Sequence, residues 1–317
     1  MTTATTSTPV VMDVDTGIDD AIALLLAARS PAIDLVGVGT VLGNVDVATA
    51  TRNTLRVLEV AAADTPVAAG ADRHLLEPDR DARWVHGDDG LGDTGQPAPS
   101  RAASDEHAVD QLLRLSHDHA GALVVVAVGP LTNLALALRR DQTLTGRLAR
   151  IVVMGGSAQA GGNRGPWAEA NIASDPEAAA IVFAADVPRT MIGLDVTSRL
   201  TLDDDDVARL AASPDPVAAF AARILPFYID FYAGIHGERR CAVHDALAVA
   251  VVIDPTLVTA HRLPVTVETA GTHTRGMTVV DVRPRPATDV AMTDVALDVD
   301  VARARDELLP RLLAGTR

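Results

Sequence analysis

The order of apolar and polar positions along the chain predicts short strands that alternate with helices. Apolar runs of about four to eight residues, rich in valine and isoleucine, are typical of buried strands, and the longer stretches rich in alanine and leucine predict helices. The predicted strands are Val10–Asp15, Leu35–Val41, Val67–Ala69, Ala122–Val128, Ile151–Met154 and Arg189–Leu194. The predicted helices are Asp19–Arg29, Val47–Ala62, Leu131–Arg140, Ala178–Ala185 and Val301–Leu313.

This alternation predicts an α/β fold with one open, mostly parallel sheet flanked by helices. A sheet of this kind, with a Rossmann-like core, binds ligands at the carboxyl ends of its strands. Two glycine-rich segments, Gly87–Arg101 and Gly155–Pro166, interrupt the pattern and predict long functional loops. The segment Leu263–Val282 alternates apolar and polar residues around a turn, which predicts a β-hairpin. Because there is no internal repeat and no clear linker, we expect a single domain over residues 1–317, with residues 1–9 flexible.

The strongest chemical signal is the acidic segment that follows the first predicted strand. Asp13 and Asp15 share one face of that strand because side chains alternate, and Asp19 and Asp20 open the next helix, where the helix dipole favours carboxylates. Four carboxylates so close together repel one another unless a cation lies between them. Oxygen ligands suit a hard divalent ion such as Ca²⁺ or Mg²⁺. Capping of the helix by Asp19, with the other acids on the surface, stays the alternative interpretation.

Other polar groups follow later strands of the predicted sheet. Asn44 follows the second strand, and Gly129–Asn133 follows the fourth, where a main-chain carbonyl can bind Ca²⁺. Amide and carboxylate side chains, which can bind several sugar hydroxyls at once, lie in one segment at Asn163, Glu169 and Asn171. Each of these motifs is also compatible with an ordinary turn or polar loop.

Histidines and tyrosines complete the set of candidate residues. His86 stands at the mouth of the first glycine-rich loop, and the pair His244 and Asp245 begins an apolar helix. His244 can donate a proton, while Asp245 can join a metal site or cap its helix. Tyr228 and Tyr232 are four residues apart, so they form one stripe on a helix. They can stack on a flat ligand and offer it hydroxyls, or they can pack in the core.

Composition and charge restrict the possible partners. Hydrophobic residues make up 48% of the chain and charged residues 22%, which favours a folded core over disorder. The formal net charge of −15 predicts repulsion from nucleic acids and anionic membranes. The longest uninterrupted apolar runs are too short to span a membrane, and Met1–Pro9 lacks the features of a secretory signal, so we expect a cytoplasmic protein. The single cysteine, Cys241, excludes a disulfide framework within the chain.

Taken together, these motifs resemble those of the inosine-uridine-preferring nucleoside hydrolase family. The resemblance extends from Val10 to the helix that ends near Leu313, and the acidic segment Asp13–Asp20 is its most specific part. The supporting motifs follow in the family's order: Gly43-Asn44, His86-Gly87, Gly129–Asn133, Met154-Gly155-Gly156, Asn163 with Glu169 and Asn171, Asp175–Ala178, and His244-Asp245. The resemblance implies an enzyme that cleaves the N-glycosidic bond of purine or pyrimidine ribonucleosides to free base and ribose. It also implies a Ca²⁺-bound water and a homodimer or homotetramer.

The resemblance further implies how the metal and the sugar are held. The implied metal ligands are Asp15, Asp20, the main-chain carbonyl of Val128, and Asp245. The implied ribose contacts are Asp19, Asn44, Met154, Asn163, Glu169, Asn171 and Asp245. Asp15 is implied as the general base, and Asp13 is expected to hold the loop.

On the side of the leaving base, the resemblance implies that His244 donates the proton and that His86 lies nearby. Base preference is expected to depend on the loop around His86 and on the segment Phe227–Tyr232. We expect the two tryptophans, Trp84 and Trp167, to be structural, although either could stack on a purine.

Two other functions are compatible with parts of the sequence. A haloacid-dehalogenase-type phosphatase would use Asp13 as nucleophile and Asp15 as acid. That pattern has threonine or valine where Gly17 stands, and it needs a lysine, which this chain lacks. A non-catalytic protein that binds nucleosides or ribose on the same fold would retain all the polar positions, and only release of free ribose separates it from an enzyme.

Overall fold

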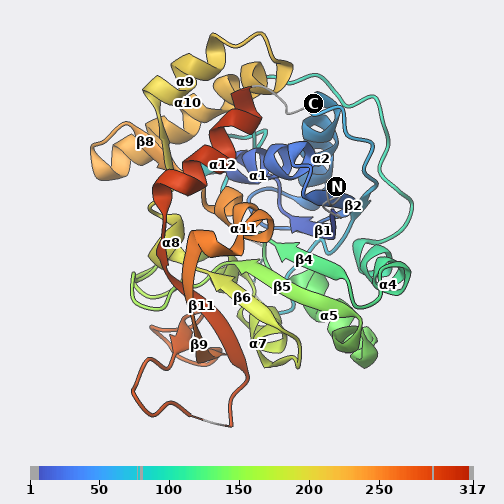
Figure 1. Ribbon diagram of the computed structural model, residues 1–317, viewed down its shortest axis with the longest axis vertical. Helices are drawn as coiled ribbons and strands as arrows, with labels where there is room; N and C mark the ends of the chain where they lie inside the picture. Colours follow the sequence, from blue (N-terminus) through green and yellow to red (C-terminus); the bar gives the residue numbers. More distant parts are fainter. Residues whose placement is uncertain (1–6, 77, 79–80, 288, 314–317) are drawn as a thin grey trace, which may run out of the picture.

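The backbone is organised around one large sheet whose strands are mostly parallel. The computed structural model describes residues 7–76, 78, 81–287 and 289–313 (Figure 1). Within these residues, nine strands form a sheet in the order β10-β9-β11-β6-β5-β4-β1-β2-β3, and β7 and β8 form a separate antiparallel pair. The strands are β1 (Thr8–Val14), β2 (Ile33–Thr40), β3 (Val67–Ala69), β4 (Leu123–Ala127), β5 (Leu148–Met154), β6 (Arg189–Ile192), β7 (Thr201–Asp203), β8 (Arg240–Ala242), β9 (Val258–Val267), β10 (Thr278–Val280) and β11 (Met292–Val299).

Helices cover both faces of the sheet, and the buried apolar residues accordingly form two clusters. One cluster joins a face of the sheet to α1, α2, α9, α10, α11 and α12, and the other joins the opposite face to α4, α5 and α7. The helices are α1 (Ile18–Arg29), α2 (Val47–Val60), α3 (Arg83–His86), α4 (Ala108–Asp118), α5 (Thr132–Arg140), α6 (Ala170–Ser174), α7 (Pro176–Ala184), α8 (Leu194–Thr197), α9 (Asp204–Ala211), α10 (Pro216–His236), α11 (His244–Ile253) and α12 (Val301–Leu313). Two short 3₁₀ helices, η1 (Gln142–Gly146) and η2 (Pro255–Leu257), follow α5 and α11.

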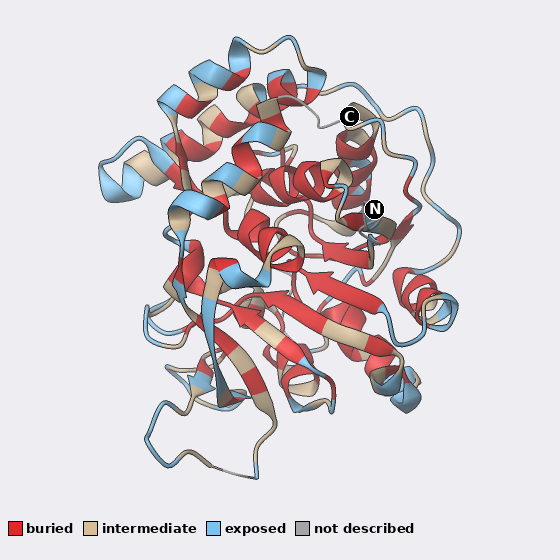
Figure 2. Ribbon diagram, viewed as in Figure 1, coloured by how far each residue is buried: buried red, intermediate tan, exposed pale blue. Residues whose placement is uncertain are grey.

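The central strands are apolar along their whole length because both of their faces are covered. In β4, Val124 and Val126 belong to the first apolar cluster, whereas Leu123 and Val125 belong to the second. Successive side chains of a strand point to opposite faces, so a strand between two helical layers buries all of them (Figure 2). This explains why these strands are unbroken apolar runs in the sequence.

The predicted fold class is confirmed. All neighbouring strands from β3 across the sheet to β11 run parallel, whereas β9 runs antiparallel to both β11 and β10. The predicted hairpin is also present, with Val267 of β9 paired to Thr278 of β10. The sequence analysis does not predict β11 or α4. Strand β11 lies between β9 and β6, and local alternation carries no information about such long-range pairing.

The N-terminal segment 1–9, which we expect to be flexible, is described only in part. Residues 1–6 lie outside the described residues. Thr8 and Pro9 belong to β1 and pair with Ile33 and Asp34 of β2, so this end of the segment is a strand.

Helix α10 is the one helix in the described part of the chain that is long and apolar enough, by length and composition, to cross a membrane. Arg223 and Asp230 interrupt its apolar sequence, so it contains no long unbroken apolar run. One such helix is weak evidence, since helices of a protein core pass the same test. Helix α10 packs against α9, β8 and α12, and its residues Val217 and Ile224 are fully buried. We therefore interpret α10 as a packed helix of this fold.

Asn133, near the start of α5, ties the carboxyl ends of three strands together. Its Nδ2 donates to Oδ1 of Asp13 in β1 (2.8 Å) and to the carbonyl of Thr40 at the end of β2 (2.9 Å). Its Oδ1 accepts the backbone N–H of Ala71, which follows β3 (2.8 Å). The side chain is buried, so these bonds are shielded from water.

We predict that Asn133→Ala lowers the free energy of unfolding by about 3 kcal/mol or more, because three buried polar groups lose their partner. Urea denaturation measures this change. The matched control is Gln142→Ala, an exposed position just after the same helix, which should change the free energy of unfolding by less than about 0.5 kcal/mol. A loss at Asn133 no larger than that of the control would contradict the tie.

Candidate active site

The candidate site is a pocket at the carboxyl ends of the parallel strands, where ligands bind in sheets of this type. The cavity has a volume of about 340 Å³. Most of the candidate residues chosen from the sequence line it: Asp19, Asn44, His86, Val128, Met154, Asn163, Glu169, Asn171, Tyr228, Tyr232, His244 and Asp245. The remaining two, Asp15 and Asp20, are buried, with 1% and 0% of their surface exposed.

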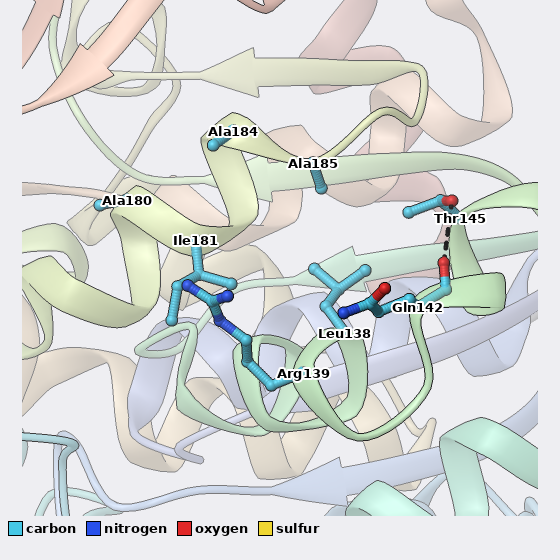
Figure 3. Close-up of a pocket in the computed structure, with 8 residues that line it drawn as sticks. All are labelled: Leu138, Arg139, Gln142, Thr145, Ala180, Ile181, Ala184 and Ala185. Carbon is cyan, nitrogen blue, oxygen red and sulfur yellow. Dashed lines mark hydrogen bonds between the residues drawn. The ribbon is translucent and has the colours of Figure 1, made fainter.

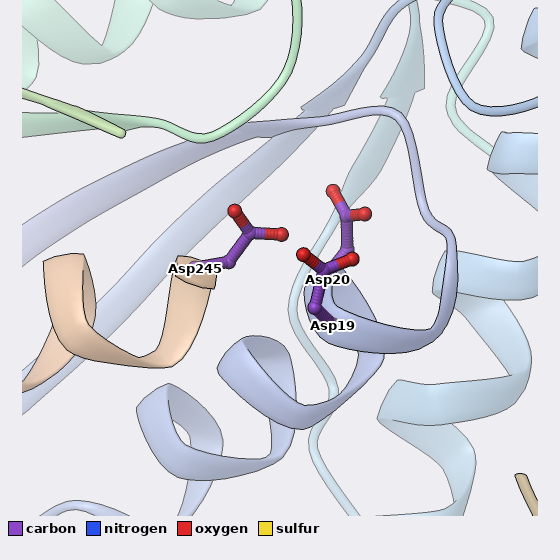
Figure 4. A group of neighbouring side chains, drawn as sticks. All are labelled: Asp19, Asp20 and Asp245. Atoms are coloured by element: carbon purple, nitrogen blue, oxygen red, sulfur yellow. The ribbon is translucent and has the colours of Figure 1, made fainter. Parts of the chain in front are cut away.

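Three carboxylates face one another where two helices begin (Figure 4). Asp19 and Asp20 lie in the first turn of α1, and Asp245 lies in the first turn of α11. Each offers an oxygen within 4.8 Å of the other two. Asp15 adjoins this group, because its backbone N–H donates to Oδ1 of Asp20 (3.1 Å). The fold thus brings the acidic segment near the N-terminus together with an acid from the last third of the chain.

The carboxylate of Asp15 fits between two glycines that follow β2 and β4. A Cβ on Gly43 would lie 2.0 Å from Oδ2 of Asp15, and a Cβ on Gly129 would lie 2.9 Å from its Oδ1. No larger residue at Gly43 leaves room for the carboxylate in this position. The backbone of two loops therefore encloses Asp15.

Asn44 bridges Asp15 and Asp20, the two most deeply buried acids of this group. Its backbone N–H donates to Oδ2 of Asp15 (2.6 Å), and its Nδ2 donates to Oδ2 of Asp20 (3.0 Å). Oδ2 of Asp20 also accepts the backbone N–H of Gly17 (2.9 Å). These donors orient both carboxylates without adding a positive charge.

Burial raises the pKa of each carboxyl in this group. The pKa of Asp19 rises to about 8, first because of burial and then because of the charge of Asp20. Burial and the charge of Asp20 also hold the pKa of Asp15 well above its usual range, and burial raises the pKa of Asp20. For Asp245, burial is the largest cause, followed by the charges of the neighbouring acids, which raise its pKa well above the usual range. Without a cation, this group must retain protons near neutral pH.

The residues present fit a bound metal ion. Oδ1 of Asp15 and Oδ1 of Asp19 are buried and have no hydrogen-bond partner among the described residues. A buried polar atom without a partner costs free energy. A divalent cation would satisfy both oxygens and offset the repulsion between the carboxylates, and an all-oxygen donor set suits a hard ion.

Glu169 forms part of another wall of the pocket and begins α6. Its carboxylate accepts the backbone N–H groups of Asn171 (3.0 Å) and Ile172 (3.2 Å), which lie in the first turn of that helix. It also accepts the N–H of Gly156 (3.0 Å), which follows β5. Burial nevertheless raises the pKa of Glu169. The carboxylate of Glu169 thus satisfies N–H groups of both the loop after β5 and the first turn of α6.

The two candidate asparagines of this wall are held differently. Nδ2 of Asn171 donates to the carbonyls of Val128 (2.6 Å) and Met154 (3.2 Å), at the ends of β4 and β5. Asn163 is exposed, and its Oδ1 accepts the backbone N–H of Ala170 (2.9 Å). Asn171 is therefore anchored on the sheet, whereas Asn163 depends on the loop that carries it.

His244 stands between two hydroxyl groups. Its Nε2 lies 2.8 Å from the hydroxyl of Tyr232, and its Nδ1 lies 2.8 Å from Oγ1 of Thr197 in α8. Burial lowers the pKa of His244 to about 4, so its ring is neutral at pH 7. The sequence analysis does not include Thr197, which lies far from His244 in the chain and belongs to no recognised motif.

Tyr228 and His86 stack beside the acidic group. Their ring centroids are 5.2 Å apart, and the hydroxyl of Tyr228 donates to Oδ2 of Asp19 (3.2 Å). Nδ1 of His86 accepts the backbone N–H of Ile18 (3.1 Å), which fixes its ring against the start of α1. Burial, followed by the charge of His244, lowers the pKa of His86 to about 3. Both tyrosines of the predicted stripe thus face the pocket as well as packing on the core.

The mouth of the pocket carries apolar side chains that the sequence analysis does not assign to the site. Trp84 is 59% exposed, lines the pocket, and packs edge-on against Phe231 with centroids 5.2 Å apart. Ile235 is 56% exposed and lines the same mouth. Trp167 is exposed but lies outside this pocket. The sequence does contain one indication that Trp84 belongs to the site, because it lies two residues before the candidate residue His86.

A second cavity, of about 400 Å³, lies between α5 and α7 (Figure 3). Its lining includes Leu138, Arg139 and Gln142 on one side and Ile181 and Ala184 on the other. These residues come from the ends of helices that precede β5 and β6, so the cavity lies at the amino edge of the sheet. It contains none of the candidate residues, and we assign no chemistry to it.

Known proteins are similar to this chain in both sequence and fold. The sequence model of the inosine-uridine preferring nucleoside hydrolase family matches residues 10–306. An inosine-uridine preferring nucleoside hydrolase of Leishmania major is 39% identical over 295 residues, which cover 92% of this chain and 93% of that protein. The pyrimidine-specific ribonucleoside hydrolase RihA of Photobacterium profundum is 39% identical over 308 residues, covering 96% and 99%. The solved structure of a purine-preferring ribonucleoside hydrolase from Gardnerella vaginalis has a TM-score of 0.90 at 35% identity, covering 96% of this chain and 98% of that one.

The fold and the site therefore define a hydrolase that acts on N-glycosyl bonds. The chain belongs to the inosine-uridine preferring nucleoside hydrolase family. This confirms the resemblance found in the sequence and the prediction of ribonucleoside hydrolysis, and it favours an enzyme over a protein that only binds nucleosides.

We predict that the metal-free protein loses stability as the pH rises from about 5 to about 8. Asp13, whose pKa burial raises to about 7, and Asp19, with a pKa of about 8, both have pKa values near 3.8 when unfolded. Between these values the folded state binds more protons than the unfolded state at these two carboxyls, and the raised pKa values of Asp15, Asp20 and Asp245 add to the difference. The buried, neutral His86 and His244 act in the opposite direction below a pH of about 6.5. Because five carboxyls outweigh two imidazoles, raising the pH favours unfolding. Urea unfolding of chelator-treated protein at several pH values measures the slope.

An excess of divalent cation provides the control for this pH series. Because a bound cation stabilises the ionised carboxylates, it should remove most of the decline and stabilise the protein more at pH 8 than at pH 5. Metal-free protein whose stability is constant or rises over this range would contradict the description of the buried acids.

Proposed function

We propose that this nucleoside hydrolase acts on purine or pyrimidine ribonucleosides, releases the free base and ribose, and uses Ca²⁺ as its resident metal ion. The observation that carries the proposal is the meeting of three buried carboxylates, Asp19, Asp20 and Asp245, beside a pocket of polar side chains. The buried Asp15 adjoins them, joined to Asp20 through Asn44. A cation between these buried carboxylates relieves their repulsion and lets them ionise near neutral pH, and Ca²⁺ binds oxygen ligands of this kind.

In this proposal the ion is held by Asp15, Asp20, Asp245 and the main-chain carbonyl of Val128. Val128 lines the pocket, and its carbonyl accepts Nδ2 of Asn171. When bound, Ca²⁺ supplies positive charge that attracts the ribose hydroxyls and lowers the pKa of a neighbouring water. Asp19 is close enough to be a further ligand. Following the family resemblance, we assign it to the ribose, with Tyr228 donating to its Oδ2.

Asp15 acts as the general base. Its Oδ2 is occupied by the N–H of Asn44, while its buried Oδ1 has no partner in the described structure and is available to take a proton from water. The oxygen of that water then bonds to the anomeric carbon, and the bond from this carbon to the base nitrogen breaks. The enclosure by Gly43 and Gly129 holds the carboxylate in place during this step.

The ribose is held by side chains from several strand ends. Cleavage of a glycosidic bond passes through a sugar with oxocarbenium character, which carries positive charge. Carboxylates and amide oxygens close to the ring favour that charge. We assign the contacts to the ribose to Asp19, Asn44, Met154, Asn163, Glu169, Asn171 and Asp245. Among these, the carboxylates of Asp19, Glu169 and Asp245 favour the positive charge most strongly.

His244 donates a proton to the leaving base. Since burial lowers its pKa to about 4 in the free protein, the donor role requires that the substrate raise this pKa, and the negative charge that develops on the base does so. Tyr232 lies within hydrogen-bond distance of Nε2 and so fixes the ring. Tyr228 and His86 supply a stacked surface for the base.

We propose a broad range of bases, because the mouth is bounded by apolar rings that stack on any base. The relatives named above have inosine-uridine, pyrimidine and purine preferences, which supports both base classes without choosing between them. The single domain, the cytoplasmic location and the homodimer or homotetramer stay predictions.

We predict that chelation abolishes release of ribose from inosine, uridine, cytidine and adenosine, and that added Ca²⁺ restores it. Asp15→Asn, which keeps the size of the side chain, should lower kcat by about 10³-fold because the base is lost. The exposed Asp34→Asn provides the matched control and should leave kcat unchanged. Turnover like that of the wild type in Asp15→Asn would remove Asp15 from the mechanism.

We predict that His244→Ala lowers kcat with inosine by about 10²- to 10⁴-fold, and with p-nitrophenyl riboside much less, because p-nitrophenolate leaves without a proton. His236→Ala, at the pocket mouth, is the control and should affect both substrates equally. If His244→Ala reduces kcat by the same factor with both substrates, His244 is not the acid.

A further inference from the structure

The loop between β5 and α6 carries one of the proposed ribose contacts and ends at another. It runs from Gly155 to Glu169, has no regular secondary structure, and contains five glycines. Glycine-rich backbone loses much conformational entropy on ordering. Asn163 can therefore hold a ribose hydroxyl with useful affinity only if other parts of the protein fix this loop.

The first part of this loop is fixed by side chains from three other places in the fold. The backbone N–H groups of five successive residues, 156 to 160, are all accepted by side-chain oxygens. Glu169 accepts the first (3.0 Å), and Oγ1 of Thr278 in β10 accepts the second (2.8 Å). Asp195 accepts the remaining three, from Ala158 (2.7 Å), Gln159 (2.8 Å) and Ala160 (3.1 Å).

Asp195 belongs to a helical turn that touches two walls of the pocket. The turn is α8, Leu194–Thr197, and its Thr197 lies 2.8 Å from Nδ1 of His244. The backbone N–H of Leu194 donates to the carbonyl of Gly156 (2.9 Å). A Cβ on Gly193 would lie 2.8 Å from that same carbonyl oxygen, so the turn and the loop are in close contact.

We propose that Asp195 is a positioning residue for the ribose: its carboxylate fixes residues 158–160 and thereby places Asn163 at the sugar. This inference rests on the proposed ribose contact of Asn163. A carboxylate that accepts three N–H groups makes charge-assisted bonds, which are stronger than neutral ones. Asn163 follows Ala160 by only three residues, and its Oδ1 accepts the backbone N–H of Ala170, at the start of α6 (2.9 Å).

Glu169 does not depend on Asp195 in the same way. It is 2% exposed and is held by N–H groups at the start of α6, in addition to that of Gly156. The acidic group also has its own anchor, since Asn44 holds Asp15. His244 is contacted by Tyr232 of α10 as well as by Thr197 of α8. Loss of the Asp195 carboxylate should therefore weaken capture of the sugar more than it slows the chemical step.

The experiment measures KM and kcat with inosine for Asp195→Ala, Asp195→Asn, Asn163→Ala and the double variant Asn163→Ala with Asp195→Ala. We expect Asp195→Ala to raise KM about tenfold, the size of one lost hydrogen bond, while kcat changes less than about threefold. Asp195→Asn keeps one acceptor oxygen, so its KM should lie between those of the wild type and Asp195→Ala. In the Asn163→Ala background, removal of Asp195 should have little further effect on KM.

Asp141→Ala is the matched control. Asp141 is also half-buried and accepts the N–H and hydroxyl of Thr143 and Nη2 of Arg147, but it lies at the opposite edge of the sheet. Its removal should leave KM unchanged even if thermal stability falls. Calcium affinity, measured by titration of metal-free protein, should be the same in Asp195→Ala as in the wild type.

Three outcomes would overturn the inference. If Asn163→Ala raises KM but Asp195→Ala does not, Asp195 has no positioning role. If Asp195→Ala raises KM by the same factor in both backgrounds, it acts independently of Asn163. If Asn163→Ala itself leaves KM unchanged, the proposed ribose contact is wrong, and the inference as stated is wrong with it.

Discussion

The repulsion between buried carboxylates is the constraint on which the site depends. Asp15, Asp19, Asp20 and Asp245 are each at least 90% buried, where charges interact far more strongly than in water. Their neighbours supply oriented N–H and hydroxyl donors, as Asn44 and Tyr228 do, but the two nearest histidines are kept neutral by burial. The compensating positive charge must therefore come from a ligand. A protein that keeps this arrangement accepts lower stability in the metal-free state in return for a strong cation site.

The parallel sheet explains how residues so distant in sequence reach this point. Its strands end at one edge, and the turns after β1, β2 and β4 bring Asp15, Gly43 and Gly129 into contact. Helix α11 packs against α1, which places Asp245 opposite Asp19 and Asp20. Asn133 then joins three of these strand ends with one side chain. The carboxyl edge of the sheet therefore holds both the bonds of Asn133, which stabilise the strand ends, and the residues proposed for catalysis.

The sequence predicts the parts of this structure that are local. The unbroken apolar strands and the acidic turn Asp13–Asp20 are contiguous, so periodicity and charge repulsion are enough to identify them. The place of Asp245 comes from resemblance, because no local rule pairs an acid on one helix with acids on another. Strand β11 and the role of Asp195 are not predicted, for the same reason. Strand β11 is defined by its neighbours in the sheet. Asp195 is defined by the N–H groups of a loop that lies 35 or more residues earlier in the chain. The sequence predicts a structural role for Trp84, whereas its exposure at the pocket mouth becomes visible only in the fold.

The most direct test of the central claim is to locate the ion. An anomalous difference map from crystals of this protein grown with Ca²⁺ should show one strong peak per chain, in contact with carboxylate oxygens of Asp15, Asp20 and Asp245 and with the carbonyl of Val128. A map without a peak among these carboxylates, at a Ca²⁺ concentration that supports turnover, would contradict the account.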